Sequence, residues 1–312
     1  MKAVFGVKKE IPVNPGFPCM HTNAGSGVSS PTSVASNPAE LSSAVDKNWY
    51  NEFYSAQQKG SLAVHPEVVR RYSELRHPRL FYLERWFEIL GDVSDKRILY
   101  LGCGHDNSGI LLAMKGAEVW VLDIASEAVR VQVQMAEASG VGERVHPVVA
   151  TCEQIPFPDR WFDRVVGCGI WHHLQSDLET PSGEMTRVLA PEGFGVFTEP
   201  IAQSPLLSRL RKHVPVAVPA SVSPRCYPLT PESMSTLQRE FRLEAEFFKC
   251  FGRVTRLVLR GTPLEKASAW KRFAVFAVHH MDRALLSLPN TQHLAGEVVL
   301  KLSAKEAAGA VA

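Results

Sequence analysis

The stretch RILYLGCGHDNSGILLAMKGAEVWVLD, residues 97–123, decides the fold of this chain. An apolar run over Ile98–Leu101 meets the glycine turn Gly102-Cys103-Gly104, and a second apolar run ends on Asp123. The first run predicts a strand that leads into a tight turn, where two glycines lack the Cβ atoms that would keep a ligand away from the backbone. A carboxylate at the end of the next strand can accept hydrogen bonds from two ribose hydroxyls. The stretch therefore predicts a site for a nucleotide-type cofactor.

Short apolar runs alternate with amphipathic segments from Arg97 to Pro200. The expected strands are Ile98–Leu101, Glu118–Asp123, Val145–Val149, Arg164–Gly167 and Gly195–Glu199, with helices that begin near Ser108, Ser126 and Leu178. This alternation predicts an α/β fold with a doubly wound, mostly parallel sheet. After a Pro-rich, basic stretch, the pattern predicts a helix over Pro231–Phe241, extended segments over Leu243–Phe251 and Val254–Leu259, a long apolar helix over Leu264–Leu288 and a final strand over Gly296–Leu302.

Composition limits the partners and the compartment of the protein. The 312 residues include 34 basic and 32 acidic ones, and a net charge of +2 implies no overall attraction to nucleic acid. The cysteines have no paired short spacing, so neither a disulfide framework nor a metal site is expected: Cys19, Cys103, Cys152, Cys168, Cys226 and Cys250. No apolar stretch reaches the length of a secretory signal or a transmembrane segment, and we expect a cytoplasmic protein.

A dinucleotide would use a similar glycine turn and a similar acidic residue. That alternative fails at the third glycine of its fingerprint, where this chain has Asn107. Asp106 would also place a carboxylate near a pyrophosphate, and an anion there opposes binding. A cofactor with a ribose and an adenine but no phosphate fits better, and S-adenosylmethionine is such a cofactor.

Several later motifs follow the glycine loop in a fixed order. They are Leu101–Gly104, Lys115–Val119, Val121–Ala125, Glu153–Pro158, Phe162–Val166, Trp171–Leu174 and Arg187–Gly193. Over residues 95–200 the chain resembles the class I S-adenosylmethionine-dependent methyltransferases, in particular the methyltransferase type 11 group. The resemblance continues more loosely through Glu199-Pro200 and Met281–Leu286, as in members with a C-terminal extension. It implies a seven-stranded Rossmann-like sheet with helices on both faces and N-terminal lid helices.

Composition, helical spacing and the resemblance together divide the chain into parts. These are an arm expected to be disordered (1–45), lid helices (46–92), a core that binds S-adenosylmethionine (93–200), an acceptor-binding insertion with C-terminal strands and a helix (201–303), and a tail (304–312).

The resemblance implies a role in cofactor binding for a set of residues. Gly102 and Gly104, with Cys103 between them, would contact the methionine portion through the backbone, and Asp123 would bind the ribose hydroxyls. Ile124 would lie against the adenine, and Cys152 and Glu153 would cap its edge. Gly169 and Ile170 would lie near the sulfonium. Tyr54, with Trp49 and Tyr50, would cover the sulfonium as an aromatic lid. For the three aromatic residues, a role as ordinary core is an equal alternative.

Three positions depart from the family pattern. Tyr100 replaces the acidic residue common before the glycine loop, Asp106 replaces the usual third glycine, and Thr151 stands where Asp is frequent. A carboxylate commonly helps to hold the cofactor's ammonium group. Either Asp106 has moved into that role, or cofactor affinity is reduced.

Three residues are candidates for acid–base chemistry. His172 and His173 follow the fourth strand, at the carboxyl end of the sheet where ligands of α/β folds bind, and either could act as a general base. The alternative, which we favour, is that one of them packs in support of the cofactor loop. Glu199 is expected to face the acceptor pocket, where it could orient a hydroxyl or an amine; its alternative role is to bond the Pro-rich loop. Asp163 is expected to be structural.

Two surface features have alternative explanations. The basic cluster Arg209, Arg211, Lys212, His213 and Arg225 could bind an acidic acceptor, although we favour the alternative that it forms a solvated face. The apolar helix that contains Trp270 and Phe273 could dock on a membrane surface or a second subunit, or pack beside the sheet.

The sequence as a whole predicts methyl transfer to a small-molecule acceptor through an oxygen, nitrogen or carbon nucleophile, by in-line displacement. The acceptor could be acidic or aromatic, and the protein would be a monomer or a homodimer that binds no nucleic acid. Two alternatives stay open. One is an enzyme that methylates RNA or protein, and the other is a degenerate methyltransferase fold that only binds.

Overall fold

The computed structural model describes residues 47–55, 62–205, 207, 209 and 227–305. The predicted arm, most of the basic cluster, and residues 306–312 of the tail lie outside these ranges. The helices are 47–55, α2 (Pro66–Glu74), α3 (Tyr82–Leu90), α4 (Ser108–Met114), α5 (Ser126–Ala138), α6 (Glu179–Val188), α8 (Pro231–Glu240), α9 (Gly252–Leu259) and α10 (Ala269–Leu286). The strands are β1 (Arg97–Leu101), β2 (Glu118–Asp123), β3 (Val145–Val149), β4 (Phe162–Cys168), β5 (Leu189–Pro200), β6 (Phe241–Phe248) and β7 (Glu297–Ala304).

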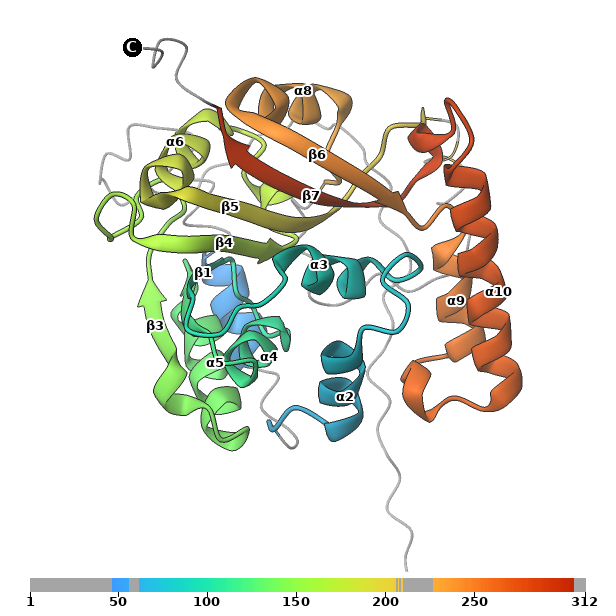
Figure 1. The fold of residues 1–312 in the computed structure, drawn as a ribbon, viewed down its shortest axis with the longest axis horizontal. Coiled ribbons are helices and arrows are strands. Elements are labelled where there is room, and N and C mark those ends of the chain that lie inside the picture. Colours follow the sequence, from blue (N-terminus) through green and yellow to red (C-terminus); the bar gives the residue numbers. More distant parts are fainter. Residues whose placement is uncertain (1–46, 56–61, 206, 208, 210–226, 306–312) are drawn as a thin grey trace, which may run out of the picture. The chain divides into compact units, whose positions relative to one another are not determined.

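The seven strands form one sheet in the order β3-β2-β1-β4-β5-β7-β6. Strands β1 to β5 pair in parallel, and β7 pairs antiparallel with both β5 and β6 (Figure 1). The order of the parallel strands reverses between β1 and β4, and α/β folds bind ligands at such a switch point. The predicted α/β class and seven-stranded sheet are confirmed.

Helices cover both faces of the sheet because the strand side chains alternate. On β1, Ile98 and Tyr100 join a core cluster with residues of α3, α4 and α5, whereas Leu99 and Leu101 join a second cluster with residues of α6 and α8. All four side chains are buried, as expected for a strand between two helical layers. Helix α3 is also tied to the sheet by Trp86 Nε1, which donates to the backbone oxygen of Val196 at 2.9 Å.

The sequence predictions were correct for the first five strands and for the starts of α4, α5 and α6, but wrong in part after Pro231. The segment Val254–Leu259 belongs to α9 and is not extended. Its β-branched residues favour a strand locally, but helical spacing buries Thr255 and lets the helix pack on α10. Strand β6 ends at Phe248 because Lys249 adopts a left-handed conformation with φ of 61°.

The expected helix Leu264–Leu288 is in fact two elements. A short 3-10 turn, η3 (Leu264–Lys266), is followed by extended residues, and α10 begins only at Ala269. No helix within the described ranges is long and apolar enough to cross a membrane.

Candidate functional site

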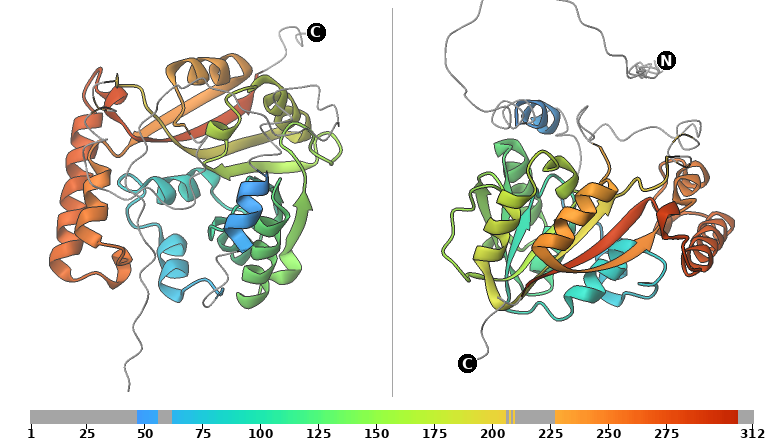
Figure 2. Two further views of the ribbon diagram at one scale, coloured as in Figure 1. Left: turned by 180° about the vertical axis from the view of Figure 1, so that it is seen from behind. Right: turned by 90° about the horizontal axis from the view of Figure 1, so that it is seen from above.

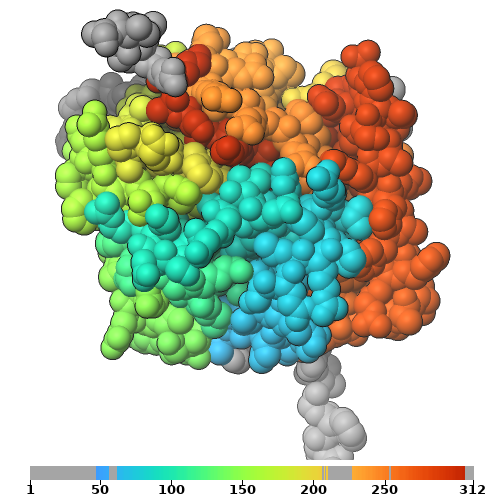
Figure 3. Space-filling model, in the orientation of Figure 1, coloured from blue at the N-terminus to red at the C-terminus, as the bar shows by residue number. Residues whose placement is uncertain are grey.

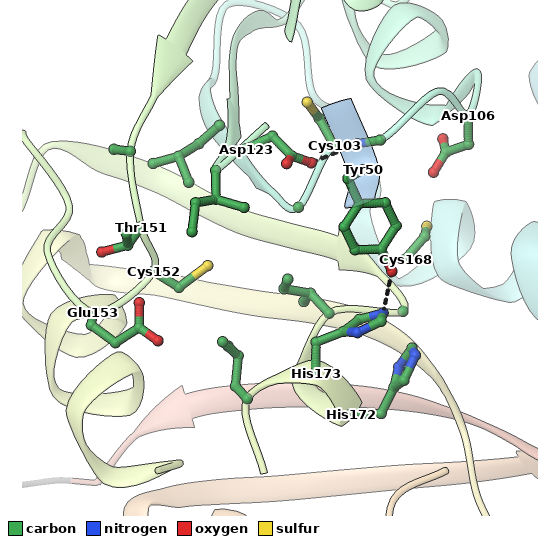
Figure 4. Close-up of a pocket in the computed structure, with 18 of the residues that line it drawn as sticks. Tyr50, Cys103, Asp106, Asp123, Thr151, Cys152, Glu153, Cys168, His172 and His173 are labelled. Carbon is green, nitrogen blue, oxygen red and sulfur yellow. Dashed lines mark hydrogen bonds between the residues drawn. The ribbon is translucent and has the colours of Figure 1, made fainter. Parts of the chain in front are cut away.

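A cavity of about 360 Å³ lies at the carboxyl ends of the parallel strands. Its walls come from the loops after β1, β2 and β4, the segment after β3, and the helix over residues 47–55, which lies on the side of the molecule that holds α4 and α5 (Figures 2 and 4). All but two of the predicted site residues line it: Tyr50, Tyr54, Gly102, Cys103, Gly104, Asp106, Asp123, Ile124, Cys152, Glu153, Gly169, Ile170, His172 and His173. The exceptions are Glu199 and Trp49.

The glycine loop needs its glycines for both conformation and space. Gly102 and Gly104 have φ values of 59° and 50°, in the left-handed region that other residues adopt only with strain. A Cβ on Gly102 would lie 2.5 Å from Cδ1 of Ile170, and a Cβ on Gly104 would lie 3.0 Å from the Tyr54 hydroxyl. The loop therefore presents bare backbone to the cavity.

Asp123 ties the end of β2 to the glycine loop. Its Oδ2 accepts a hydrogen bond from the Gly104 backbone N–H at 3.1 Å, and its Oδ1 accepts one from Ala125 N–H at 2.9 Å (Figure 4). Burial raises the pKa of the Asp123 carboxyl above its ordinary value. The carboxylate lines the cavity with 9% of the residue exposed, so a ligand hydroxyl can reach it.

Gln132, on α5, holds the glycine loop from behind. Its side-chain Nε2 donates to the backbone oxygens of Cys103 and Gly104 at 3.2 Å and of Asp106 at 2.9 Å. The residue is fully buried. The sequence prediction missed this role. A glutamine on the apolar face of the helix after β2 could have indicated it, because a buried amide needs hydrogen-bond partners.

Tyr100 and Asp106, two of the departures from the family pattern, form one hydrogen-bonded unit. The Tyr100 hydroxyl donates to Oδ2 of Asp106, and the Ser108 backbone N–H donates to Oδ1 at 2.6 Å. A Cβ on Gly109 would lie 2.9 Å from the Tyr100 ring, so this glycine makes room for the tyrosine beneath α4. Burial raises the pKa of Asp106, whereas the hydrogen bond from Tyr100 lowers it.

The expectation that Glu199 faces the pocket is wrong. The residue is fully buried at the end of β5, and it does not line the cavity. Its Oε1 accepts from the backbone N–H groups of Ile170 at 2.9 Å and Trp171 at 2.8 Å. Its Oε2 accepts from the backbone N–H of His172 at 3.3 Å and lies 2.7 Å from Nδ1 of that histidine. Glu199 therefore bonds the turn η2 (Trp171–His173) rather than an acceptor or the Pro-rich loop.

The two histidines differ in their surroundings. His172 is buried against Glu199, whereas His173 is half-buried and its Nε2 lies 3.4 Å from the Tyr50 hydroxyl (Figure 4). Burial, with a smaller effect of His172, lowers the pKa of His173 to about 3. His173 is therefore neutral near pH 7, and no positive charge of its own opposes a cation in the cavity.

The aromatic residues of the helix over residues 47–55 have different roles. Tyr50 and Tyr54 line the cavity and stack with their ring centroids 5.9 Å apart. Trp49 stacks on Phe53 at 5.3 Å and does not line the cavity. His105, Ser176 and Asp177 also line it and were not predicted, since nothing in their local sequence marks them.

Asp163 has the structural role expected of it, because its Oδ2 accepts from the Arg97 backbone N–H at 2.8 Å. Of the basic cluster, Arg209 is described and exposed, and the other members lie outside the described residues. In the part of the chain that the structure describes, no group of three or more His, Cys, Asp or Glu side chains could hold a metal ion.

Comparisons with known proteins agree with this geometry. Residues 98–193 match the family model described as "Methyltransferase domain". The ribosomal protein L11 methyltransferase of Geobacter sp. (strain M21) is 32% identical over 153 residues, which are 46% of this chain and 48% of that protein. The fatty-acid O-methyltransferase of Mycolicibacterium smegmatis is 30% identical over 110 residues, 35% of this chain and 38% of that protein. The matched region spans less than half the length of either relative.

The fold itself is shared with a solved methyltransferase. The structure of geranyl diphosphate C-methyltransferase from Streptomyces coelicolor A3(2) matches with a TM-score of 0.54 at 11% identity, covering 87% of this chain and all of that one. At this identity the likeness concerns the fold alone.

Fold, glycine loop and family match point in the same direction. Residues 98–193 are similar to the methyltransferase domain of the class I S-adenosylmethionine-dependent methyltransferases. The cofactor of this class fits the residues present, because a bare glycine loop and a carboxylate that a ligand hydroxyl can reach face one cavity. The cavity volume also lies within the range of about 300–1,000 Å³ that is usual for small-molecule sites.

Proposed function

We propose that the protein transfers a methyl group from S-adenosylmethionine to a small-molecule acceptor. The observation that carries this proposal is a single cavity that joins the glycine loop to a histidine pair and has Tyr50 and Tyr54 in its wall. When bound, S-adenosylmethionine supplies an electrophilic methyl group on a positively charged sulfur. The faces of aromatic rings attract such a cation, and the neutral His173 does not repel it.

The chain's own residues would hold this cofactor in defined places. The backbone of Gly102 and Gly104 would contact the methionine portion, and Asp123 would accept hydrogen bonds from the ribose hydroxyls. Ile124 would lie against the adenine, with Cys152 and Glu153 at its edge. Asp106 lines the cavity directly after the glycine loop and would hold the ammonium group, and the hydrogen bond from Tyr100 favours its ionised form and fixes its position.

His172 is the proposed proton acceptor, and Glu199 is its positioning residue. The carboxylate 2.7 Å from Nδ1 favours the tautomer with a proton on Nδ1, which leaves the lone pair on Nε2. The same carboxylate stabilises the imidazolium that forms when Nε2 takes a proton from the acceptor. This arrangement suits a hydroxyl or an activated carbon, because such nucleophiles must lose a proton as the methyl group is transferred.

The first test is incubation of the protein with S-adenosylmethionine labelled in the methyl group and a fractionated cell extract. Label in a small-molecule fraction is the expected result, and it identifies the acceptor. A protein acceptor is the second candidate, because one relative is named as a ribosomal protein methyltransferase. Label that is found only in protein would favour it and overturn the small-molecule proposal.

Calorimetric titration with S-adenosylhomocysteine separates the proposed enzyme from a protein that only binds. Micromolar binding that is lost in Asp123→Ala is expected. Binding without transfer to any fraction would indicate the degenerate alternative. Once an acceptor is known, His172→Gln and Glu199→Gln should both lower kcat by about 10²-fold or more. They should leave binding of S-adenosylhomocysteine within a few-fold, and an unchanged kcat would remove His172 from the mechanism.

A further inference from the structure

The hairpin of α9 and α10 carries an unusual exposed surface. Helix α10 presents a regular stripe of apolar residues to solvent, at the spacing of one helical face: Trp270, Phe273, Ala277, Met281 and Ala284, continued by Leu288. Phe273 is 76% exposed and Trp270 is 64% exposed. Such a continuous stripe is uncommon on a surface that contacts only water.

The stripe is separate from the face by which α10 packs. The buried residues Val275, His279 and Leu286 lie on the opposite side of the same helix. Helix α10 is therefore apolar on two sides; one side packs against the part of the chain that the structure describes, and the other is exposed there. On α9, Val254 and Leu257 add to the exposed apolar surface.

The exposed charged residues that the structure describes on this hairpin are basic. Arg256, Arg260, Lys266 and Arg272 are exposed. The acidic side chains that the structure describes between residues 252 and 288 are both engaged in contacts. Asp282 is buried and accepts from the Phe251 N–H at 2.7 Å. Glu265 forms an ion pair with Arg71 at 2.9 Å. The surface is thus both apolar and basic, although the chain as a whole has a net charge of only +2.

We propose that the α9–α10 hairpin docks on an anionic lipid bilayer, with the stripe of α10 in the interface. An apolar face with Trp and Phe, flanked by Lys and Arg, is the composition of helices that lie in the plane of a membrane. Anionic headgroups complement the arginines and lysines. A second copy of the chain fits this surface less well than a bilayer, because a two-fold dimer would bring two basic surfaces together.

The hairpin's place in the fold relates the surface to the cavity. Strand β6 runs parallel to β5, so α9 leaves the sheet at its carboxyl edge, and β7 re-enters at the same edge (Figure 1). In Figure 3 the orange-red atoms of the hairpin form the right-hand side of the face in view. Docking would bring the edge that holds the cavity towards the bilayer, but the inference does not depend on the proposed function.

Vesicle co-sedimentation of the full chain tests the proposal. Vesicles of phosphatidylcholine with 30% phosphatidylglycerol should bind the protein at least tenfold better than pure phosphatidylcholine at low salt, and 0.5 M NaCl should remove the difference. Trp270→Ser and Phe273→Ser should each weaken binding about tenfold or more, since burial of an aromatic side chain shifts an equilibrium by that order. Arg256→Glu with Arg260→Glu should abolish the preference for anionic vesicles.

Trp161→Ser is the matched control. Trp161 is an exposed aromatic residue just before β4, at the opposite edge of the sheet, so this variant should bind vesicles like the parent. Circular dichroism confirms that each variant is folded. The proposal is overturned if the parent does not bind anionic vesicles or if Phe273→Ser binds equally well. It is also overturned if sedimentation shows a dimer that Phe273→Ser converts to a monomer, since the stripe would then belong to a second copy.

Discussion

Substitution of Tyr100 by Phe removes one hydroxyl from beneath the cavity and leaves the ring that packs on Gly109. The hydroxyl donates to Oδ2 of Asp106, whose other oxygen accepts from the Ser108 N–H. A hydrogen bond to a charged group contributes about 1.5–3 kcal/mol. We therefore expect Tyr100→Phe to lower the free energy of unfolding by about 2 kcal/mol at neutral pH, which is large for the loss of a single atom.

The loss of stability caused by Tyr100→Phe should increase as the pH rises. Burial raises the pKa of Asp106 in the folded protein above its ordinary value, so the folded state binds this proton more tightly than the unfolded state. This difference lowers the free energy of unfolding. The loss is absent below the unfolded pKa of about 4 and grows as the pH rises through the folded pKa. Loss of the Tyr100 hydroxyl raises that pKa further. The effect of Tyr100→Phe on stability should therefore be smallest near pH 4 and largest at pH 7.

A double-mutant cycle with Asp106→Asn, measured by urea denaturation at pH 5 and pH 7.5, tests this reasoning. Tyr100→Phe should cost much less in the Asp106→Asn background, which corresponds to a coupling energy of at least about 1 kcal/mol at pH 7.5. Additive effects, or a coupling that grows as the pH falls, would refute the account. Binding of S-adenosylhomocysteine reports separately on function. If Asp106 holds the ammonium group, Asp106→Asn should weaken binding about tenfold even in a variant that remains fully folded.

Three further predictions concern other residues. Gln132→Leu should lower stability by about 1–3 kcal/mol and weaken binding of S-adenosylhomocysteine, because three loop carbonyls lose their donor; urea denaturation and calorimetry measure the two effects. Gly102→Ala should abolish detectable cofactor binding, since the added Cβ meets Ile170 at 2.5 Å, and unimpaired binding would contradict the geometry. Burial lowers the pKa of His279 to about 4 in the folded protein. Because the unfolded chain takes up this proton more readily, the free energy of unfolding should fall by up to about 3 kcal/mol as the pH falls from 6.5 to 4. In His279→Leu that part of the pH dependence should disappear from thermal melts.

The parts of the fold that were predictable depend on local pattern. Strands β1 and β2 are short apolar runs followed by turn residues, so the local pattern of side chains alone predicts them, whereas for the longer β5 it predicted only Gly195–Glu199. Helix α9 could not be assigned this way, because Val254, Thr255 and Val258 favour extended structure locally. Its helical state depends on packing against α10, which lies later in the chain.

The site was predictable where a motif fixes the backbone and unpredictable where two distant residues meet. The glycine loop and Asp123 belong to one motif, and both line the cavity as expected. The partnership of Tyr100 with Asp106 was not predicted, since each was considered only as a departure at its own position. Their contact depends on the path of the loop and on the space left by Gly109.

Two carboxylates at strand ends explain why the cavity walls keep their shape. Asp123 at the end of β2 accepts from the backbone of the glycine loop, and Glu199 at the end of β5 accepts from the backbone of η2. The two residues differ in exposure, because Asp123 retains 9% of its surface beside the cavity and Glu199 retains none. A carboxylate with some exposure can exchange a backbone donor for a ligand hydroxyl, whereas a fully buried one with four donor atoms around it cannot do so without leaving those donors unpaired. A carboxylate at a strand end can therefore stay accessible to a ligand, as at Asp123, or be committed to the neighbouring turn and its histidine, as at Glu199.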